Sequence, residues 1–268
     1  MAIYDCFQYF NEDHMVDLRM NILKNNVDYF VISESTKNHQ GKDKKLNFNF
    51  EKFKKFKNKI IYLVAEFEKE RKFVNHLGGE SLIEQHQRNN LINGLSKASD
   101  NDLIIISDSD EIPDLKKINQ IKPTTKFTAF SQKMFMYKLN LQNLNESNWI
   151  GSKICLKKYL PRPQKLRDLK FKDYPFWRID KKNLQIIKGG WHFSFLQKPN
   201  EIAEKIRSYS HGEFNTVENT NEDKIKKKIE DGEDIFNRGF NLQKINIDSS
   251  FPDYIVNNQK ILKDWIIQ

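Results

Sequence analysis

The sequence contains little cysteine and no long apolar run. Cys6 and Cys155 are too few and too far apart along the chain for a disulfide framework or a thiolate zinc site. No stretch approaches the roughly 18 apolar residues that a membrane-spanning helix needs. Residues 1–14 lack the basic and then apolar regions of a secretory signal. We therefore expect a cytoplasmic chain in a reducing compartment.

Acidic residues are the minority charge. Lys and Arg total 45 against 36 Asp and Glu, so the formal net charge is +9. Such a surface favours anionic partners, namely nucleic acid, anionic lipid or a phosphorylated small molecule. The lysine runs at 51–59 and 223–231 also carry acids and apolar residues at helical spacing, which predicts solvated helix faces. We expect no nucleic-acid partner and leave open a weak peripheral contact with a membrane.

The first half of the chain alternates strand-like and helix-like segments. Its strand-like segments are apolar without strict alternation, which is typical of a mostly parallel sheet with helices on both faces. The sequence therefore predicts an α/β, Rossmann-like core. The expected strands are 3–10, 27–33, 59–65 and 102–107, and the expected helices are 14–26 and 80–99.

The second half predicts longer strands and more loops. The absence of an internal repeat or a long linker favours a single domain over residues 1–268. The expected elements are strands at 126–140, 151–160 and 183–196, a helix at 199–211, and loops at 141–149 and 161–182.

In the segment 102–114, DLIIISDSDEIPD, an apolar strand that we expect to be buried is followed by four acids, Asp108, Asp110, Glu111 and Asp114. Ligands of open α/β sheets bind beyond the carboxyl ends of the strands. Two carboxylates one residue apart can hold Mg²⁺ or Mn²⁺ there, and the cation would offset the repulsion among the acids. The alternative is that Asp110 and Asp114 cap a short helix at 114–121.

The same segment resembles the Asp-x-Asp element of nucleotide-sugar glycosyltransferases with the GT-A fold. The wider sequence is similar to glycosyltransferase family 17, which includes β-1,4-mannosyl-glycoprotein β-1,4-N-acetylglucosaminyltransferases. The similar stretches follow the family's order and are 5–23, 27–48, 87–95, 108–113 and 189–211. The resemblance implies an inverting transfer of a sugar, N-acetylglucosamine from UDP-N-acetylglucosamine, to a hydroxyl of an acceptor glycan. Residues 1–125 would form the nucleotide-sugar half, and residues 126–268 the acceptor half.

The resemblance also implies the metal site. Asp108 and Asp110 would hold Mn²⁺ or Mg²⁺ and the diphosphate, with Asp110 the more direct ligand. A late histidine would complete the site, either His192 or His211. The alternative for His192 is a structural histidine beside a core tryptophan.

The remaining candidate residues divide into donor, acceptor and catalytic groups. Arg19 could bind a phosphate or form a salt bridge from helix to loop, and the aromatic candidates could equally be core. For the donor we expect Asn11, Glu12, Arg19, Glu34, Ser35, Lys45, Arg88, Asp108, Ser109 and Asp110; for the acceptor Glu111, Trp191 and Trp177.

An inverting transfer needs a carboxylate that takes the acceptor's proton. Glu213 is the expected base and forms the catalytic group with Asp110. Asp173 and Asp180 are alternative candidates for the base. Gly189 and Gly190 would allow a close backbone approach next to His192.

Two other functions compete with glycosyl transfer. In phosphohydrolases of the haloacid dehalogenase type, a buried strand is also followed by Asp-x-Asp. In that case Asp108 would be the nucleophile and Asp110 the general acid. That superfamily places the pair at its first strand, however, and here at least three expected strands precede it. The second alternative is a glycan-binding protein without catalysis.

Overall fold

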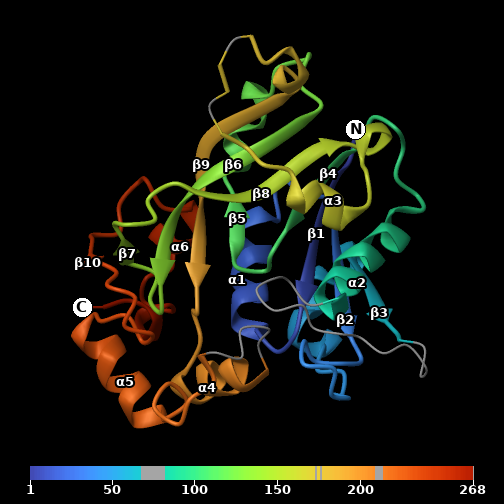
Figure 1. Ribbon diagram of the computed structural model, residues 1–268. Coiled ribbons are helices and arrows are strands. Elements are labelled where there is room, and N and C mark those ends of the chain that lie inside the picture. Colours follow the sequence, from blue (N-terminus) through green and yellow to red (C-terminus); the bar gives the residue numbers. More distant parts are fainter. Residues whose placement is uncertain (68–81, 173, 176, 209–213, 268) are drawn as a thin grey trace.

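The fold is an α/β sheet with helices on both faces, described here from a computed structural model (Figure 1). The structure describes residues 1–67, 82–172, 174–175, 177–208 and 214–267. Its main strand order is β10-β7-β6-β8-β4-β1-β2-β3, and β9 and β5 pair outside this path. The expected α/β fold class is confirmed.

The first half supplies the parallel part of the sheet. β1 (Ile3–Tyr9) lies between β2 (Tyr29–Ser35) and β4 (Leu103–Ser107), and β3 (Ile60–Ala65) pairs with β2. All three ladders are parallel. Every residue of β4 is buried, as its uninterrupted apolar run predicts for a strand covered on both faces.

Successive side chains of these strands enter two different cores. Phe7, Phe30 and Ile105 pack on the side of α1 (Asp13–Leu23). Cys6 and Ile104 point the opposite way, where they pack with the 3₁₀ turn Leu91–Leu95 that follows α2 (Leu82–Asn90). The period of two along each strand therefore decides which helix each side chain meets.

The second half adds strands of both directions. β8 (Trp149–Leu156) is antiparallel to β4 and to β6 (Phe127–Met136), and β9 (Leu184–Ser194) is parallel to β6. The short strands β5 (Glu111–Pro113), β7 (Leu141–Asn143) and β10 (Leu242–Lys244) pair antiparallel at the margins. The longest ladders, β1–β2, β2–β3 and β6–β9, are parallel.

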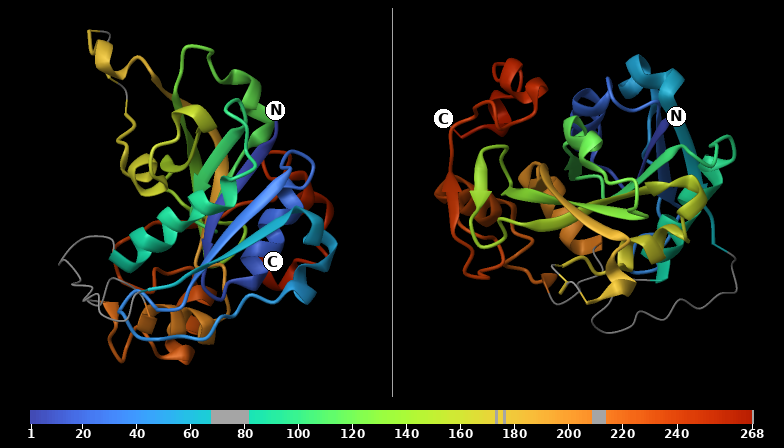
Figure 2. Two further views of the ribbon diagram at one scale, coloured as in Figure 1. Left: turned by 90° about the vertical axis from the view of Figure 1, so that its right-hand side faces the viewer. Right: turned by 90° about the horizontal axis from the view of Figure 1, so that it is seen from above.

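A third core closes the second half. α4 (Pro199–Ser208) and α5 (Glu222–Asp231) pack Ile202, Ile206 and Ile225 against Met136 of β6. The chain then returns to the first core, where α6 (Asp253–Asn257) lies beside α1, as Figure 2 also shows. The two halves therefore share one continuous sheet and the first of these three apolar cores.

The expected elements largely agree with the structure, with two corrections. The loop expected at 141–149 contains β7, and the loop expected at 161–182 contains α3 (Pro163–Asp168). Pro163 occupies the first turn of α3, where its missing N–H costs no hydrogen bond. Of the two lysine runs, 223–231 forms α5, whereas 51–59 forms the 3₁₀ segment Phe50–Lys59.

Both cysteines are buried and free. Burial raises the pKa of Cys155 to about 12, so its thiol stays protonated at neutral pH. Among the described residues, no helix combines the length and the apolar character needed to cross a bilayer.

The carboxyl ends of several strands lie at one edge of the sheet, where ligands of α/β folds bind. β1, β2 and β4 are mutually parallel. β6 runs in the same direction as β4 because β8 lies between them in the sheet and is antiparallel to both, and β9 is parallel to β6. In Figure 1 the arrowheads of β1 and β9 point down toward α4. This carboxyl edge therefore gathers Tyr9, Ser107 and Ser194.

We predict that Gly190→Ala lowers stability by about 1–3 kcal/mol, whereas Gly189→Ala has a smaller effect. Gly190 has φ +109° and sits opposite Pro113, and an added Cβ would lie 2.5 Å from the carbonyl oxygen of Ile112. At Gly189 the added atom meets mainly the flexible side chain of Lys117. Urea unfolding of both variants measures the difference, and equal losses would contradict the prediction.

Candidate active site

A cavity of about 480 Å³ opens at the carboxyl edge of the sheet. Its walls come from the end of β1, the turn between β4 and β5, the end of β9, and α4. Among its lining residues are Tyr9, Glu12, Asp108, Ser109, Asp110, Trp149, Arg167, His192, Ser194, Lys205 and Arg238. The strand ends thus place acidic, cationic and aromatic side chains around one space.

Arg19 fixes the turn that carries the acids. Its side chain is fully buried, and Nε and Nη2 donate to the two carboxylate oxygens of Asp5 at 2.7 and 2.6 Å. Nη1 lies 3.1, 3.2 and 2.6 Å from the carbonyl oxygens of Asp108, Ser109 and Glu111. Arg19 therefore joins α1 and β1 to this turn. The ion pair of Arg19 is therefore with a strand, its contact with the turn is to backbone carbonyl groups, and it does not line the cavity. A contact with phosphate stays a prediction.

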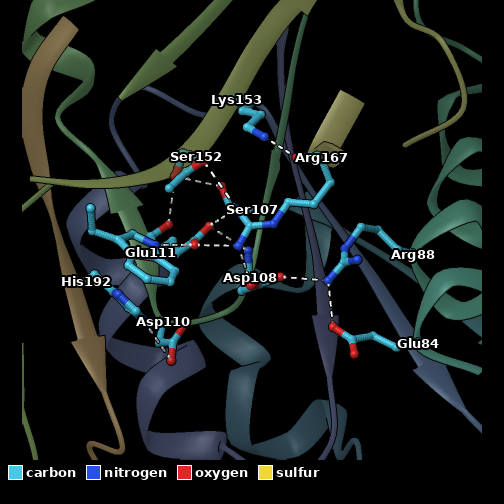
Figure 3. Close-up of polar contacts among 12 residues, drawn as sticks. Glu84, Arg88, Ser107, Asp108, Asp110, Glu111, Ser152, Lys153, Arg167 and His192 are labelled. Carbon is cyan, nitrogen blue, oxygen red and sulfur yellow. Dashed lines mark hydrogen bonds and ion pairs between the residues drawn. The ribbon is translucent and has the colours of Figure 1, made fainter. Parts of the chain in front are cut away.

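Asp108 is held by two arginines (Figure 3). Oδ1 lies 3.1 Å from Nη2 of Arg88, and Oδ2 lies 2.8 Å from Nη2 of Arg167. Withdrawal from water would raise the pKa of Asp108, but Arg167 and then Arg88 outweigh that effect and hold the pKa below its usual range. Asp108 is therefore ionised, with both oxygens directed at guanidinium groups.

Glu111 turns away from the cavity. It is fully buried, and its carboxylate accepts hydrogen bonds from Trp149 Nε1 at 2.7 Å and from Arg167 at 2.8 and 3.0 Å. Figure 3 shows Arg167 reaching both Glu111 and Asp108. The structure thus gives Glu111 a role in ordering the turn and does not bring it to the cavity as an acceptor contact.

Asp110 and His192 face each other across the cavity wall. Nε2 of His192 lies 3.5 Å from Oδ2 of Asp110, and Trp149 packs beside the imidazole with ring centroids 4.8 Å apart. Burial would lower the pKa of His192, but the charge of Asp110 outweighs it and raises that pKa. Burial likewise acts to raise the pKa of Asp110, and His192 outweighs it and lowers that pKa. Nδ1 of His192 is buried without a hydrogen-bond partner.

The residues of this wall fit a divalent cation in part. Asp110 and His192 offer a carboxylate oxygen and an imidazole nitrogen at one point, whereas the oxygens of Asp108 are taken by arginines. Mg²⁺ or Mn²⁺ needs only one or two protein ligands where a diphosphate and water supply the rest. Within the described ranges, no group of three or more His, Cys, Asp or Glu side chains forms a metal site. His211 lies outside the described residues.

Two further expected donor residues lie beside the acidic turn. Ser109 donates to Oε1 of Glu12 at 2.8 Å, and both residues line the cavity. The other carboxylate oxygen of Glu12 accepts from the backbone N–H groups of Phe10 and Asn11. The side chain of Asn11 contacts Glu204 and Gln197 next to this turn.

Other expected donor residues are not brought to the cavity. Glu34 is fully buried and accepts from Asn47 N, Phe48 N and Tyr62, so it anchors the segment after β2. Ser35 bonds to the backbone of Lys37, and Lys45 is exposed on the same segment. Arg88 is buried behind Asp108, where it also pairs with Glu84.

The two expected sugar-stacking tryptophans are also placed elsewhere. Trp191 is buried in the core and donates to the carbonyl oxygen of Ser250, so its ring is not a platform. Trp177 precedes β9, and the cavity-lining residues His192 and Ser194 lie at the other end of that strand. Leu184 and His192 are eight residues apart on β9, a separation of roughly 26 Å.

Sequence reasoning missed Arg167, Lys205 and Arg238, three cations that line the cavity. Arg167 comes from α3, within a stretch expected to be a loop, and the others come from α4 and the segment after α5. No local pattern marks them, because they approach the acids only through the fold. Glu213, the expected base, lies outside the described residues.

We predict that Arg19→Met costs about 3–5 kcal/mol of stability, because it leaves the buried carboxylate of Asp5 without its partner. The double variant Asp5→Leu with Arg19→Met should lose less than the sum of the two single variants, since it removes both charges. Arg162→Met, at an exposed position, is the control and should change stability by less than about 0.5 kcal/mol. Additive losses in denaturant unfolding would show that the two side chains are not coupled.

Comparison with solved structures gives only distant likenesses. A Bacillus anthracis structure described as a glucose-1-phosphate thymidylyltransferase in complex with a sucrose is 12% identical, with TM-score 0.38, covering 71% of this chain and 88% of that chain. HddC from Yersinia pseudotuberculosis is 12% identical, with TM-score 0.33, covering 72% and 89%. A glycosyltransferase involved in glycosylation of the major capsid of PBCV-1 is 11% identical, with TM-score 0.30, covering 70% and 81%. At these scores the likenesses carry no argument about this chain.

Comparison at the level of sequence is decisive. No curated protein matches the chain. The family model described as glycosyltransferase family 17 matches residues 1–240, which includes the acidic turn, Arg167, His192 and α4. Because this match covers most of the 268 residues, the chain belongs to glycosyltransferase family 17 and is a glycosyltransferase.

Proposed function

We propose that the chain moves a sugar, N-acetylglucosamine from UDP-N-acetylglucosamine, to a hydroxyl of an acceptor glycan with inversion, in the presence of Mn²⁺ or Mg²⁺. The observation that carries the proposal is the pair Asp110 and His192 on the wall of a cavity that also presents Arg167, Lys205 and Arg238. A metal ligand pair beside three cations suits a diphosphate, which carries negative charge and binds hard cations. A neutral sugar alone would not require it.

The chain's own residues would divide the work of holding the donor. Asp110 and His192 would hold the cation, which neutralises the charge of the diphosphate when bound. His192 would give up its proton to act as a ligand, because only the neutral imidazole binds a metal. Arg88 and Arg167 keep Asp108 ionised and in place, and Arg19 keeps the turn behind it rigid.

The transfer itself needs a base and a stabilised leaving group. The acceptor oxygen forms the new glycosidic bond at the anomeric carbon while the bond from that carbon to the β-phosphate oxygen breaks. The bonding electrons leave with UDP, where nearby cations such as Lys205 stabilise the developing charge. The hydroxyl proton passes to a carboxylate, for which Glu213 stays our prediction.

The alternatives predict different chemistry in the same cavity. A phosphohydrolase would need Asp108 as a free nucleophile, yet both of its oxygens face arginines. A glycan-binding protein without catalysis would have no use for the three cations Arg167, Lys205 and Arg238 in the cavity. These contacts support glycosyl transfer over both.

We predict that UDP binds the chain only in the presence of Mn²⁺ or Mg²⁺, and that Asp110→Asn weakens this binding and the turnover of the UDP-sugar about 100-fold or more. Loss of a metal ligand removes several kcal/mol of charge stabilisation, which corresponds to a factor of this size. Isothermal titration calorimetry measures the binding, and release of UDP from a panel of UDP-sugars measures turnover.

Asp114→Asn is the matched control for Asp110→Asn. Asp114 belongs to the same acidic segment but lies outside the cavity lining, where it caps the 3₁₀ turn Leu115–Gln120. Its variant should bind UDP as the parent does. Cleavage of aryl phosphates without any response to UDP would instead establish the phosphohydrolase, and glycan binding that ignores nucleotide would establish the lectin.

A further inference from the structure

An exposed arm stands at the edge of the sheet opposite the cavity. It comprises residues 170–183, of which 173 and 176 lie outside the description, and it precedes β9. Figure 2 (left) shows it projecting from the rest of the molecule, and Figure 1 shows it at the end of β9 away from α4. The side chains of the arm therefore do not contribute to the cavity at the carboxyl edge of the sheet.

The arm exposes large apolar side chains at its tip. The exposed fraction is 65% for Trp177 and 71% for Ile179, and Tyr159 at the base of the arm is 37% exposed. Single exposed apolar residues are ordinary, but a tryptophan and an isoleucine two residues apart on a projecting segment expose apolar surface at one place. Tryptophan is also the side chain most favoured at the boundary between lipid and water.

The arm and its base also carry cations. Lys172, Arg178 and Lys181 each lie within 5.7 Å of the ring centroid of Tyr174. At the base of the arm, Lys126 and Lys158 each lie 5.4 Å from the ring centroid of Tyr159, and Lys126 N donates to the carbonyl oxygen of Asn183. Residues 170–183 contain five Lys and Arg against two Asp, so the arm has a net positive charge that suits an anionic surface.

We propose that the arm docks the protein on an anionic lipid surface, with Trp177 and Ile179 entering the headgroup layer and the lysines and arginine of the arm contacting the lipid phosphates. Exposed apolar side chains on a segment with a net positive charge are the combination that binds such surfaces. A second copy of the chain would present the same positive charge and be repelled, and a neutral glycan gives the cations no partner. Because β9 separates the arm from the cavity, a docked chain keeps the cavity away from the lipid and open to water.

The test is sedimentation of the full chain with phosphatidylcholine vesicles, with and without phosphatidylglycerol. We expect binding only to the anionic vesicles and its loss at high salt, since screening weakens exposed charge contacts. Trp177→Ala and Lys172→Glu should each lower the partition coefficient about tenfold. Tryptophan emission should shift to the blue on binding, and Trp177→Phe should abolish that shift.

The matched control is Lys54→Glu, which makes the same change of charge at an exposed position in the segment Phe50–Lys59. It should bind the vesicles as the parent does, and thermal unfolding confirms that each variant is folded. The proposal fails if the anionic vesicles do not sediment the chain, if Lys54→Glu weakens binding as much as Lys172→Glu, or if Trp177→Ala binds unchanged. Tighter binding to an RNA oligonucleotide than to the vesicles would assign the arm to nucleic acid instead. None of these outcomes depends on UDP binding, so this proposal and the proposed function fail separately.

Discussion

The buried guanidinium of Arg19 is the contact on which the site depends. It neutralises Asp5 inside the sheet and, with its remaining N–H groups, binds the backbone carbonyls of the turn from Asp108 to Glu111. A turn of this kind would otherwise bury carbonyl groups without partners, at a cost of about 1–3 kcal/mol each. Through one side chain, α1 and β1 therefore determine where the acids stand at the end of β4.

The four acids after β4 avoid mutual repulsion because each has a partner, although Asp108 and Glu111 share Arg167. Asp108 faces Arg88 and Arg167, and Glu111 faces Arg167 and Trp149. Asp110 faces His192, and the fourth acid, Asp114, caps the following 3₁₀ turn. The different partners therefore give different functions to neighbouring acidic residues. Only Asp110 combines exposure to the cavity with a neighbour that can also ligate a metal.

The two edges of the sheet carry different surfaces. At the carboxyl edge, strand ends and α4 surround a cavity lined by acids and cations. At the amino edge, the arm before β9 presents exposed apolar side chains and several cations. Since a strand of eleven residues separates them, the proposed chemistry and the proposed attachment would use different side chains.

The sequence by itself determined the strands, the carboxyl-edge position of the acids and the family, because apolar periodicity and a contiguous motif are local properties. It also singled out His192, which the structure places beside Asp110, and its role as a metal ligand stays a prediction. It could not place Arg167, whose helix begins in a stretch rich in loop residues, and it misplaced Glu34, Trp177 and Trp191 because burial and distance depend on the partner strands. Only the tertiary structure decided which acids pair with arginines and which one faces the cavity, because those partners come from α1, α2, α3 and β9, far apart in the chain.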